Sequence, residues 1–203
     1  IFTSDDSGQN GYDIIYRAAE GEIPVFSGGI PVTNWEKAPD SQLWISTMQN
    51  VKPFRQLYVN GIRAKRAASK NTVEGNRWIS GDISDHDGIS VSSEKIPDLF
   101  RPHDLELHWI FDWMDIRLLV RDIVDNADDS KTLWMKQPDC FYCFQKNGLD
   151  DSKRWTYKLD VPFYLENAIE LLDEVGEWYF NPDTSELFYM PRDGENMNNV
   201  FYR

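Results

Sequence analysis

The sequence predicts an all-β fold, an antiparallel β-sandwich or barrel-like domain with one or two short helices. Leu105–Trp109 alternates apolar and polar residues with a period of two, which is typical of a half-buried strand. Asp115–Val124 and Thr132–Met135 are β-rich runs separated by a charged loop, which indicates a long hairpin with its tip in solvent. Strands that come as hairpins with regular turn signals favour a sandwich.

A second hairpin is predicted around Asn60-Gly61. This dipeptide lies between Leu57–Val59 and Ile62–Ala64, and it supplies the two positive φ angles that a type I′ turn requires. Upstream, Tyr12–Trp35 contains short β-branched and aromatic runs broken by glycines, which predicts short strands separated by turns.

The C-terminal part predicts a short helix followed by an aromatic hairpin. Leu165, Ala168, Ile169 and Leu172 follow the spacing i, i+3, i+4, i+7 of a helix, and Gly176 is placed to end it. The runs 177–180 and 187–190 are rich in aromatic residues, and the Asn-Pro-Asp between them favours a tight turn. One face of this hairpin is expected to pack on the helix.

Three blocks carry a family resemblance: Tyr12–Gly29, Phe54–Ala67 and Val161–Arg192. In order and spacing they resemble passages of bacterial right-handed parallel β-helix proteins of the pectate-lyase-like superfamily, many of which are glycoside hydrolases. The resemblance implies early β-helix coils at 1–35 and an inserted antiparallel β domain at 36–160. It further implies that 161–203, the short helix and hairpin, leads back to the β-helix, so that the chain is an N-terminal portion.

Composition excludes some partners. The net charge of −13 and a pI near 4.6 argue against nucleic acid, because phosphate binding needs clustered Lys and Arg. No apolar run approaches the length of a membrane span. Cys140 and Cys143 form a Cys-x-x-Cys pair in a stretch that indicates a strand, and without a second pair at metal spacing they are interpreted as structural or incidental. We expect no cofactor and no metal site.

Two acidic groups are candidates for sugar contact or catalysis. Asp112 and Asp115 flank Trp113 and lie close to Trp109, and a ring face beside carboxylates suits a pyranose. The alternative is a core tryptophan with acids in a turn. The second group, at 82–87, is dense in aspartate but lacks the oxygen spacing of a calcium loop, so a solvated loop is favoured.

Glu166 and Asn167 are further candidates for carbohydrate contact, since they lie in the block with the strongest resemblance. The alternative is that one of them caps the short helix and satisfies buried backbone. In the resembling hydrolases the catalytic carboxylates lie on later coils. No catalytic residue is therefore assigned in this chain.

The sequence leaves two functions open. The first is the N-terminal part of a secreted, periplasmic or cell-surface glycoside hydrolase that acts on plant or host polysaccharide, the part itself being noncatalytic. The alternative is a noncatalytic carbohydrate-binding or structural capping module, or part of a polysaccharide lyase. The location and the polysaccharide are implied by the resemblance alone. Without later coils, one face of the aromatic hairpin is expected to be uncovered and to promote self-association.

Overall fold

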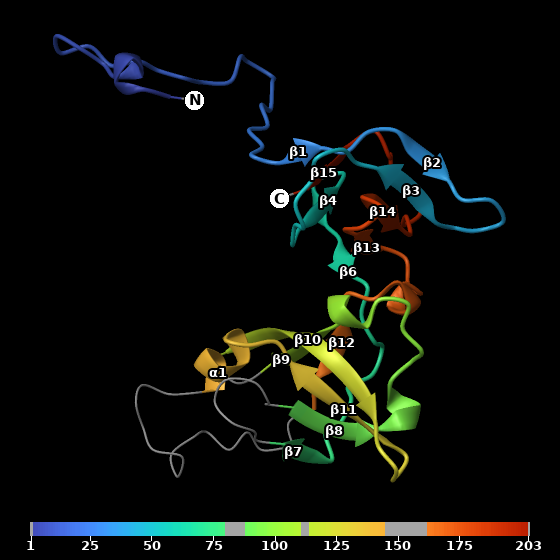
Figure 1. The fold of residues 1–203 in the computed structure, drawn as a ribbon. Coiled ribbons are helices and arrows are strands. Elements are labelled where there is room, and N and C mark those ends of the chain that lie inside the picture. Colours follow the sequence, from blue (N-terminus) through green and yellow to red (C-terminus); the bar gives the residue numbers. More distant parts are fainter. Residues whose placement is uncertain (1, 80–87, 111–113, 145–161, 203) are drawn as a thin grey trace.

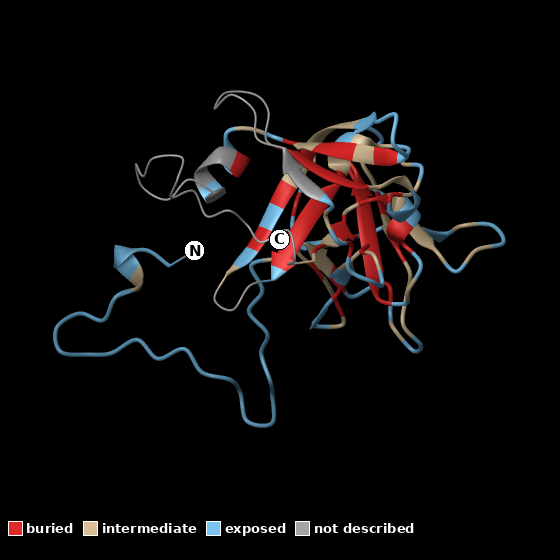
Figure 2. Ribbon diagram, turned by 90° about the horizontal axis from the view of Figure 1, so that it is seen from below, coloured by how far each residue is buried: buried red, intermediate tan, exposed pale blue. Residues whose placement is uncertain are grey.

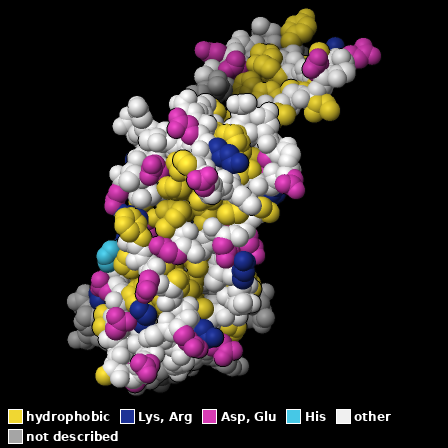
Figure 3. Space-filling model, turned by 90° about the vertical axis from the view of Figure 1, so that its right-hand side faces the viewer, with side chains coloured by type: hydrophobic (Ala, Val, Ile, Leu, Met, Phe, Trp, Pro, Cys, Tyr) yellow, Lys and Arg dark blue, Asp and Glu magenta, His cyan; other side chains and the backbone are white. Residues whose placement is uncertain are grey.

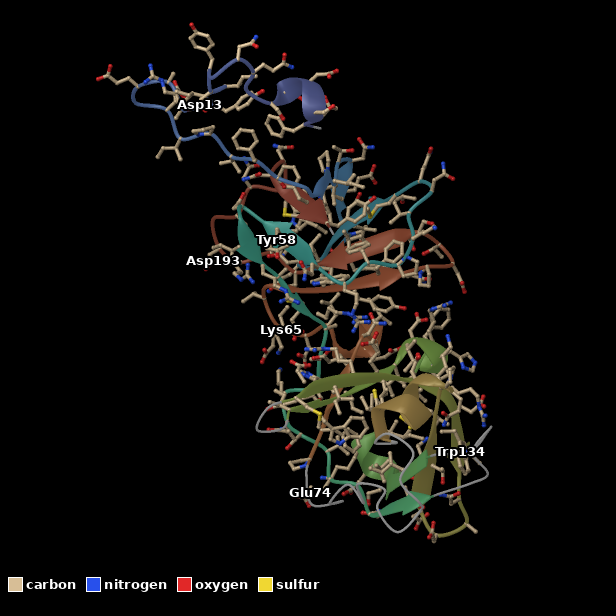
Figure 4. The ribbon with its side chains drawn as sticks, turned by 90° about the vertical axis from the view of Figure 1, so that its left-hand side faces the viewer. Asp13, Tyr58, Lys65, Glu74, Trp134 and Asp193 are labelled. Carbon is tan, nitrogen blue, oxygen red and sulfur yellow. The ribbon has the colours of Figure 1, made fainter. Side chains whose placement is uncertain are left out.

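The computed structural model describes residues 2–79, 88–110, 114–144 and 162–202, and in these ranges the protein is a two-lobed β structure with few helices (Figure 1). Three sheets of four, five and six strands build it. In Figure 4, Tyr58 and Asp193 lie in one lobe, Glu74 and Trp134 lie in the other, and Lys65 lies between them. The predicted all-β class is confirmed.

The upper lobe of Figure 1 is a sandwich of two sheets around one core. The four-stranded sheet has the order β1 (Ile30–Pro31), β15 (Val200–Tyr202), β4 (Leu57–Val59) and β5 (Ile62–Arg63). The five-stranded sheet has the order β2 (Trp35–Lys37), β3 (Trp44–Thr47), β14 (Glu186–Tyr189), β13 (Glu177–Asn181) and β6 (Lys65–Arg66). Both sheets contribute buried side chains to the upper core, among them Leu57 and Val200 from one and Trp178 and Leu187 from the other.

The predicted type I′ turn joins β4 to β5. Tyr58 pairs with Arg63 and Val59 with Ile62, which leaves Asn60 and Gly61 as a two-residue loop. Their φ angles are 51° and 80°, so both adopt the left-handed conformation that this turn needs.

The lower lobe is one strongly curled antiparallel sheet. Its order is β12 (Tyr164–Glu166), β9 (Glu106–Ile110), β10 (Asp115–Asp125), β11 (Ser130–Met135), β8 (Gly88–Ser92) and β7 (Arg77–Ile79). Ala68 and Val73 form bridges with Glu166 and Phe163, and the same segment continues into β7 at the opposite edge. The two edges of the sheet are thus brought together, in a half-barrel around the lower core.

The aromatic hairpin β13–β14 lies between the two cores. Tyr179 belongs to the lower core, whereas its neighbours Trp178 and Phe180 belong to the upper core. All five residues of β13 are buried, and Figure 2 shows red, buried segments in many of the strands. The expectation of an uncovered hairpin face is therefore wrong, because the four-stranded sheet covers the face of the hairpin that points away from the lower lobe.

The helices differ from the expectation. Leu165 lies in strand β12, and only Ile169–Leu171 forms a turn, of 3₁₀ type. The helical spacing arose because a strand and the turn after it bury their apolar side chains in the same core. Further 3₁₀ turns occupy Ser4–Asp6, Ser93–Lys95 and Pro102–Asp104.

The stretch around the cysteines is also corrected, since Asp139–Phe144 forms the helix α1 instead of a strand. Pro138 lacks the N–H that would continue a strand ladder, and Asp139 places a negative charge in the first helical turn. Cys140 is buried in the lower core, Cys143 is exposed, and neither is in a disulfide.

The N-terminal tail, residues 2–29, extends away from the upper lobe and lies in solvent (Figures 1 and 2). The short strands predicted for Tyr12–Trp35 begin only at Ile30. Backbone in the β conformation needs a paired neighbour for its N–H and C=O groups, and none lies beside the tail among the described residues.

Candidate functional site

An ion network occupies the junction between the lobes, on the face of the lower sheet opposite its core. Because side chains alternate along a strand, Glu106 and His108 of β9 point away from the buried Leu107. Glu166 of β12 pairs with Glu106, and Arg117 of β10 pairs with His108, so these side chains share one face. Cross-strand neighbours on one face lie within contact distance of each other.

The carboxylate of Glu106 forms ion pairs with two arginines that come from the upper lobe. Arg55 binds it through both terminal nitrogens, at 3.1 and 2.7 Å, and Arg66 Nη1 lies 3.1 Å from Oε2. The Glu106 side chain is 4% exposed. Arg66 also lies over the ring of Trp178 in the upper core, 5.7 Å from its centroid. This carboxylate therefore ties the lower sheet to the upper lobe.

Glu166 is the centre of the second half of the network. Its Oε1 lies 2.6 Å from His108 Nδ1, and its Oε2 accepts a hydrogen bond from Arg117 Nε at 2.9 Å. Asp115 contacts Arg117, and its Oδ1 lies 3.0 Å from His108 Nε2, although not in hydrogen-bonding geometry. His108 is buried, whereas Asp115 and Arg117 reach solvent.

The charges of the network balance, with the carboxylates of Glu106, Asp115 and Glu166 beside three guanidinium groups. Hydrogen bonding to Glu106 raises the pKa of Arg55, whereas burial lowers the pKa of Arg66. A buried charge is tolerated when it is paired and hydrogen-bonded. The arrangement occupies both buried carboxylates with arginine and histidine contacts, which suits a structural clamp.

The residues predicted from the sequence to contact carbohydrate lie in different places in the structure. Trp109 is 4% exposed and packs against Phe163 in the lower core, with ring centroids 5.1 Å apart, so its faces are covered by protein. Asp115 and Glu166 meet in the ion network. Asp112 and Trp113 lie outside the described residues, as does the aspartate-rich loop at 82–87.

Asn167 supports the backbone beside the network. It has a φ of 66°, and its side-chain amide donates to the carbonyl oxygen of Asp104 at 2.7 Å. The expectation that Asn167 or Glu166 caps a helix is wrong, because Ala168 precedes the 3₁₀ turn and no side chain caps it. The expectation that it satisfies backbone is confirmed for Asn167.

A pocket of about 690 Å³ in the upper lobe was missed from the sequence. Trp35 and Trp44, which come from the paired strands β2 and β3, contribute aromatic walls. The other walls are residues 32–34 and the loop 195–198. A signal was available in Asn34-Trp35, in Trp44 and in the asparagine-rich Glu195–Asn199, but nothing in the sequence places those segments together.

The part of the chain that the structure describes contains neither a candidate membrane-spanning helix nor a group of side chains that could bind a metal ion. None of its helices is long and apolar enough to cross a membrane. Its His, Cys, Asp and Glu side chains form no group of three or more that could hold a metal ion.

The fold and the network define a two-lobed, all-β module whose lobes are joined by an ion network. More particularly, residues 31–192 match the family described as the GH141 insertion domain, so the chain belongs to that family. A solved structure titled "Glycoside hydrolase" is similar over 87% of this chain, with 28% identity and a TM-score of 0.61. The chain spans 31% of the length of that structure. No curated protein matches.

Proposed function

We propose that this chain is a noncatalytic module of a larger glycoside hydrolase, inserted into a right-handed parallel β-helix whose coils carry the catalytic groups. The observation that carries the proposal is the state of the two buried carboxylates of the ion network, Glu106 and Glu166. Glu106 is held by two arginines, and Glu166 by His108 and Arg117. A glycosidase needs two carboxyl groups that face one sugar and exchange protons or form a bond with it. Carboxylates engaged in this way are suited to structural roles instead: Glu106 ties the two lobes together, and Glu166 ties β12 to β9 and β10.

The N-terminal tail supports the connection to a larger protein. Its apolar side chains are widely exposed, with Ile23, Val25 and Phe26 between 85% and 89% accessible. Figure 3 shows yellow apolar side chains gathered on the tail at the top of the view. Exposed apolar runs of this kind mark surfaces that another body covers. We propose that residues 12–29 pair with β-helix coils of the larger hydrolase.

The larger enzyme is proposed to act outside the cytoplasm, because a polysaccharide is too large to enter a cell intact. The module then borders the sugar-binding cleft of the enzyme or recognises part of the polysaccharide. Its own contribution is shape and binding, and the chemistry belongs to residues elsewhere in the enzyme.

The test uses a full-length hydrolase that contains this module, with its own substrate. We expect Glu106→Gln and Glu166→Gln to lower its melting temperature yet leave kcat nearly unchanged at a temperature where both variants are folded. We also expect the 203-residue chain alone to show no turnover. A loss of kcat by about 10²-fold or more in a folded variant, as for removal of a general acid or base, would refute the noncatalytic assignment.

A further inference from the structure

The pocket lined by Trp35, Trp44, residues 32–34 and the loop 195–198 has the features of a ligand site. Its volume of about 690 Å³ lies in the range of small-molecule sites, about 300–1,000 Å³. It lies at the rim of the upper core, away from the ion network. We propose that this pocket binds a neutral oligosaccharide, an inference that rests on the proposed role of the chain in a carbohydrate-active enzyme.

The tryptophans supply the apolar part of the site. Trp35 and Trp44 are half-buried, since each packs on the upper core while it lines the pocket. The ring of Trp35 lies 6.4 Å from that of Tyr189, at an angle of 60°, and this contact holds it in place. The C–H face of a pyranose is apolar, and a fixed indole face covers it without loss of side-chain freedom.

The polar part of the site is made of amides. Asn34, Asn196 and Asn198 line the pocket and are exposed, and each side chain offers two N–H donors and one carbonyl acceptor. Sugar hydroxyl groups both donate and accept, so amides suit them. Aromatic walls with a few convergent polar groups are the usual composition of a ligand pocket.

The loop that carries two of these amides is held before any ligand binds. Glu195 Oε1 accepts from Arg192 Nη1 at 2.7 Å, and its Oε2 accepts from the Arg192 backbone N–H at 2.8 Å and from the Tyr189 hydroxyl. The Asn196 side-chain oxygen accepts from the Asn198 backbone N–H at 3.0 Å. An ordered loop reduces the entropy that binding must overcome.

Charge selects a neutral sugar over an acidic one. The residues that line the pocket include Glu195 and contain neither Lys, Arg nor His. Glu195 is the carboxylate that Arg192 neutralises, and the whole chain has a net charge of −13. Recognition of a uronate carboxylate normally uses a cation, which this pocket does not present.

The experiment titrates the 203-residue chain with a panel of hexasaccharides and follows binding by calorimetry. The neutral members are xylohexaose, cellohexaose, mannohexaose and galactohexaose, and the acidic member is hexagalacturonate. We expect at least one neutral hexasaccharide to bind with a Kd below about 1 mM and more tightly than the acidic one.

Two variants locate the binding. Trp44→Leu removes an aromatic wall and is expected to weaken the Kd by about tenfold or more, as for an aromatic anchor. Asn34→Gly removes one amide yet keeps the φ of 59° that Asn34 adopts, and we expect several-fold weaker binding. Trp134→Leu, in the lower lobe, is the matched control and leaves the Kd unchanged. Circular dichroism checks that each variant is folded.

The proposal is overturned if the wild-type chain binds no neutral hexasaccharide, if it prefers hexagalacturonate, or if both pocket variants bind like the wild type. These outcomes leave the noncatalytic assignment standing, because that assignment depends on kcat of the full-length variants at Glu106 and Glu166. Conversely, loss of kcat in those variants does not alter the result of the titration.

Discussion

Glu166 lies directly opposite Glu106 on the paired strands β12 and β9, so two like charges are cross-strand neighbours at the junction of the lobes. Like charges in this position repel. The structure offsets the repulsion with Arg55 and Arg66 on one carboxylate and with Arg117 and His108 on the other. The first set joins the two lobes, and the second joins neighbouring strands of the lower sheet, so both sets support the face on which the lobes meet.

Removal of the Glu106 charge is expected to destabilise the protein strongly. In Glu106→Gln, Arg66 keeps its positive charge at 12% side-chain exposure without an anionic partner. Breaking a buried ion pair in this way costs about 3–5 kcal/mol. Urea denaturation followed by tryptophan fluorescence measures the loss. Asp115→Asn is the control, because its side chain is 56% exposed and an exposed pair contributes about 0–1 kcal/mol. Equal stability of the two variants would contradict the clamp.

Local sequence patterns predicted the hairpins well. At Asn60-Gly61 two residues are enough to predict a type I′ turn, and their observed φ angles agree with that prediction. At Asn181 the side-chain oxygen accepts from the backbone N–H groups of Asp183 and Thr184, which is the turn chemistry that the Asn-Pro-Asp motif favours.

The ion network could not be predicted, because its partners are far apart in the chain. Arg55 and Glu106 are 51 residues apart, and Glu166 and His108 are 58 apart. The order of strands in the lower sheet brings Glu166 beside His108, and the contact between the lobes brings Arg55 to Glu106. Local periodicity carries no information about either arrangement. The same reason explains the Trp35 pocket, whose walls at 32–35 and 195–198 are far apart in the chain and are brought together by the pairing of β1 with β15 and by contacts of Tyr189.

Trp178 is expected to be among the most costly residues to truncate. It is 1% exposed, and its ring stacks on Phe54 with centroids 5.0 Å apart and 7° between the planes. Trp178→Ala should lower the free energy of unfolding by about 3–5 kcal/mol, through lost burial and the cavity left behind. Phe100→Ala removes a side chain that is 77% exposed and serves as the control. Similar denaturation midpoints for the two variants would show that Trp178 does not anchor the hairpin in the upper core.

Alkaline pH should destabilise the fold through two tyrosines. Burial, and a hydrogen bond to Asp104, raise the pKa of Tyr179, while burial and a hydrogen bond to Glu195 raise the pKa of Tyr189. Below the unfolded pKa of about 10, both states hold the proton and the stability is fully present. Above it the unfolded tyrosines ionise first, so stability falls as the pH rises toward the folded pKa values.

The measurement is the free energy of unfolding from pH 9 to pH 11. Replacing both residues, in Tyr179→Phe with Tyr189→Phe, should lower stability at neutral pH and make its dependence on pH shallower in this range. Tyr12→Phe, in the exposed tail, is the matched control and should keep the wild-type slope. An unchanged slope in the double variant would mean that other groups cause the alkaline loss.

The N-terminal tail should make the chain self-associate. The aromatic hairpin is buried on both faces. Among the residues that the structure describes, most exposed large apolar side chains lie in residues 2–29, where Ile23, Val25 and Phe26 are almost fully accessible. Apolar side chains left in water associate when another apolar surface is within reach. Light scattering as a function of concentration should therefore show species larger than a monomer.

A variant without residues 1–28 keeps β1, which begins at Ile30, and should remain monomeric at the same concentrations. The double variant Val25→Ser with Phe26→Ser separates the apolar contribution from chain length, and it should reduce association while the tail is retained. If the trimmed and intact chains scatter alike, the tail is not the associating surface, and its proposed pairing with the coils of a larger hydrolase loses its support.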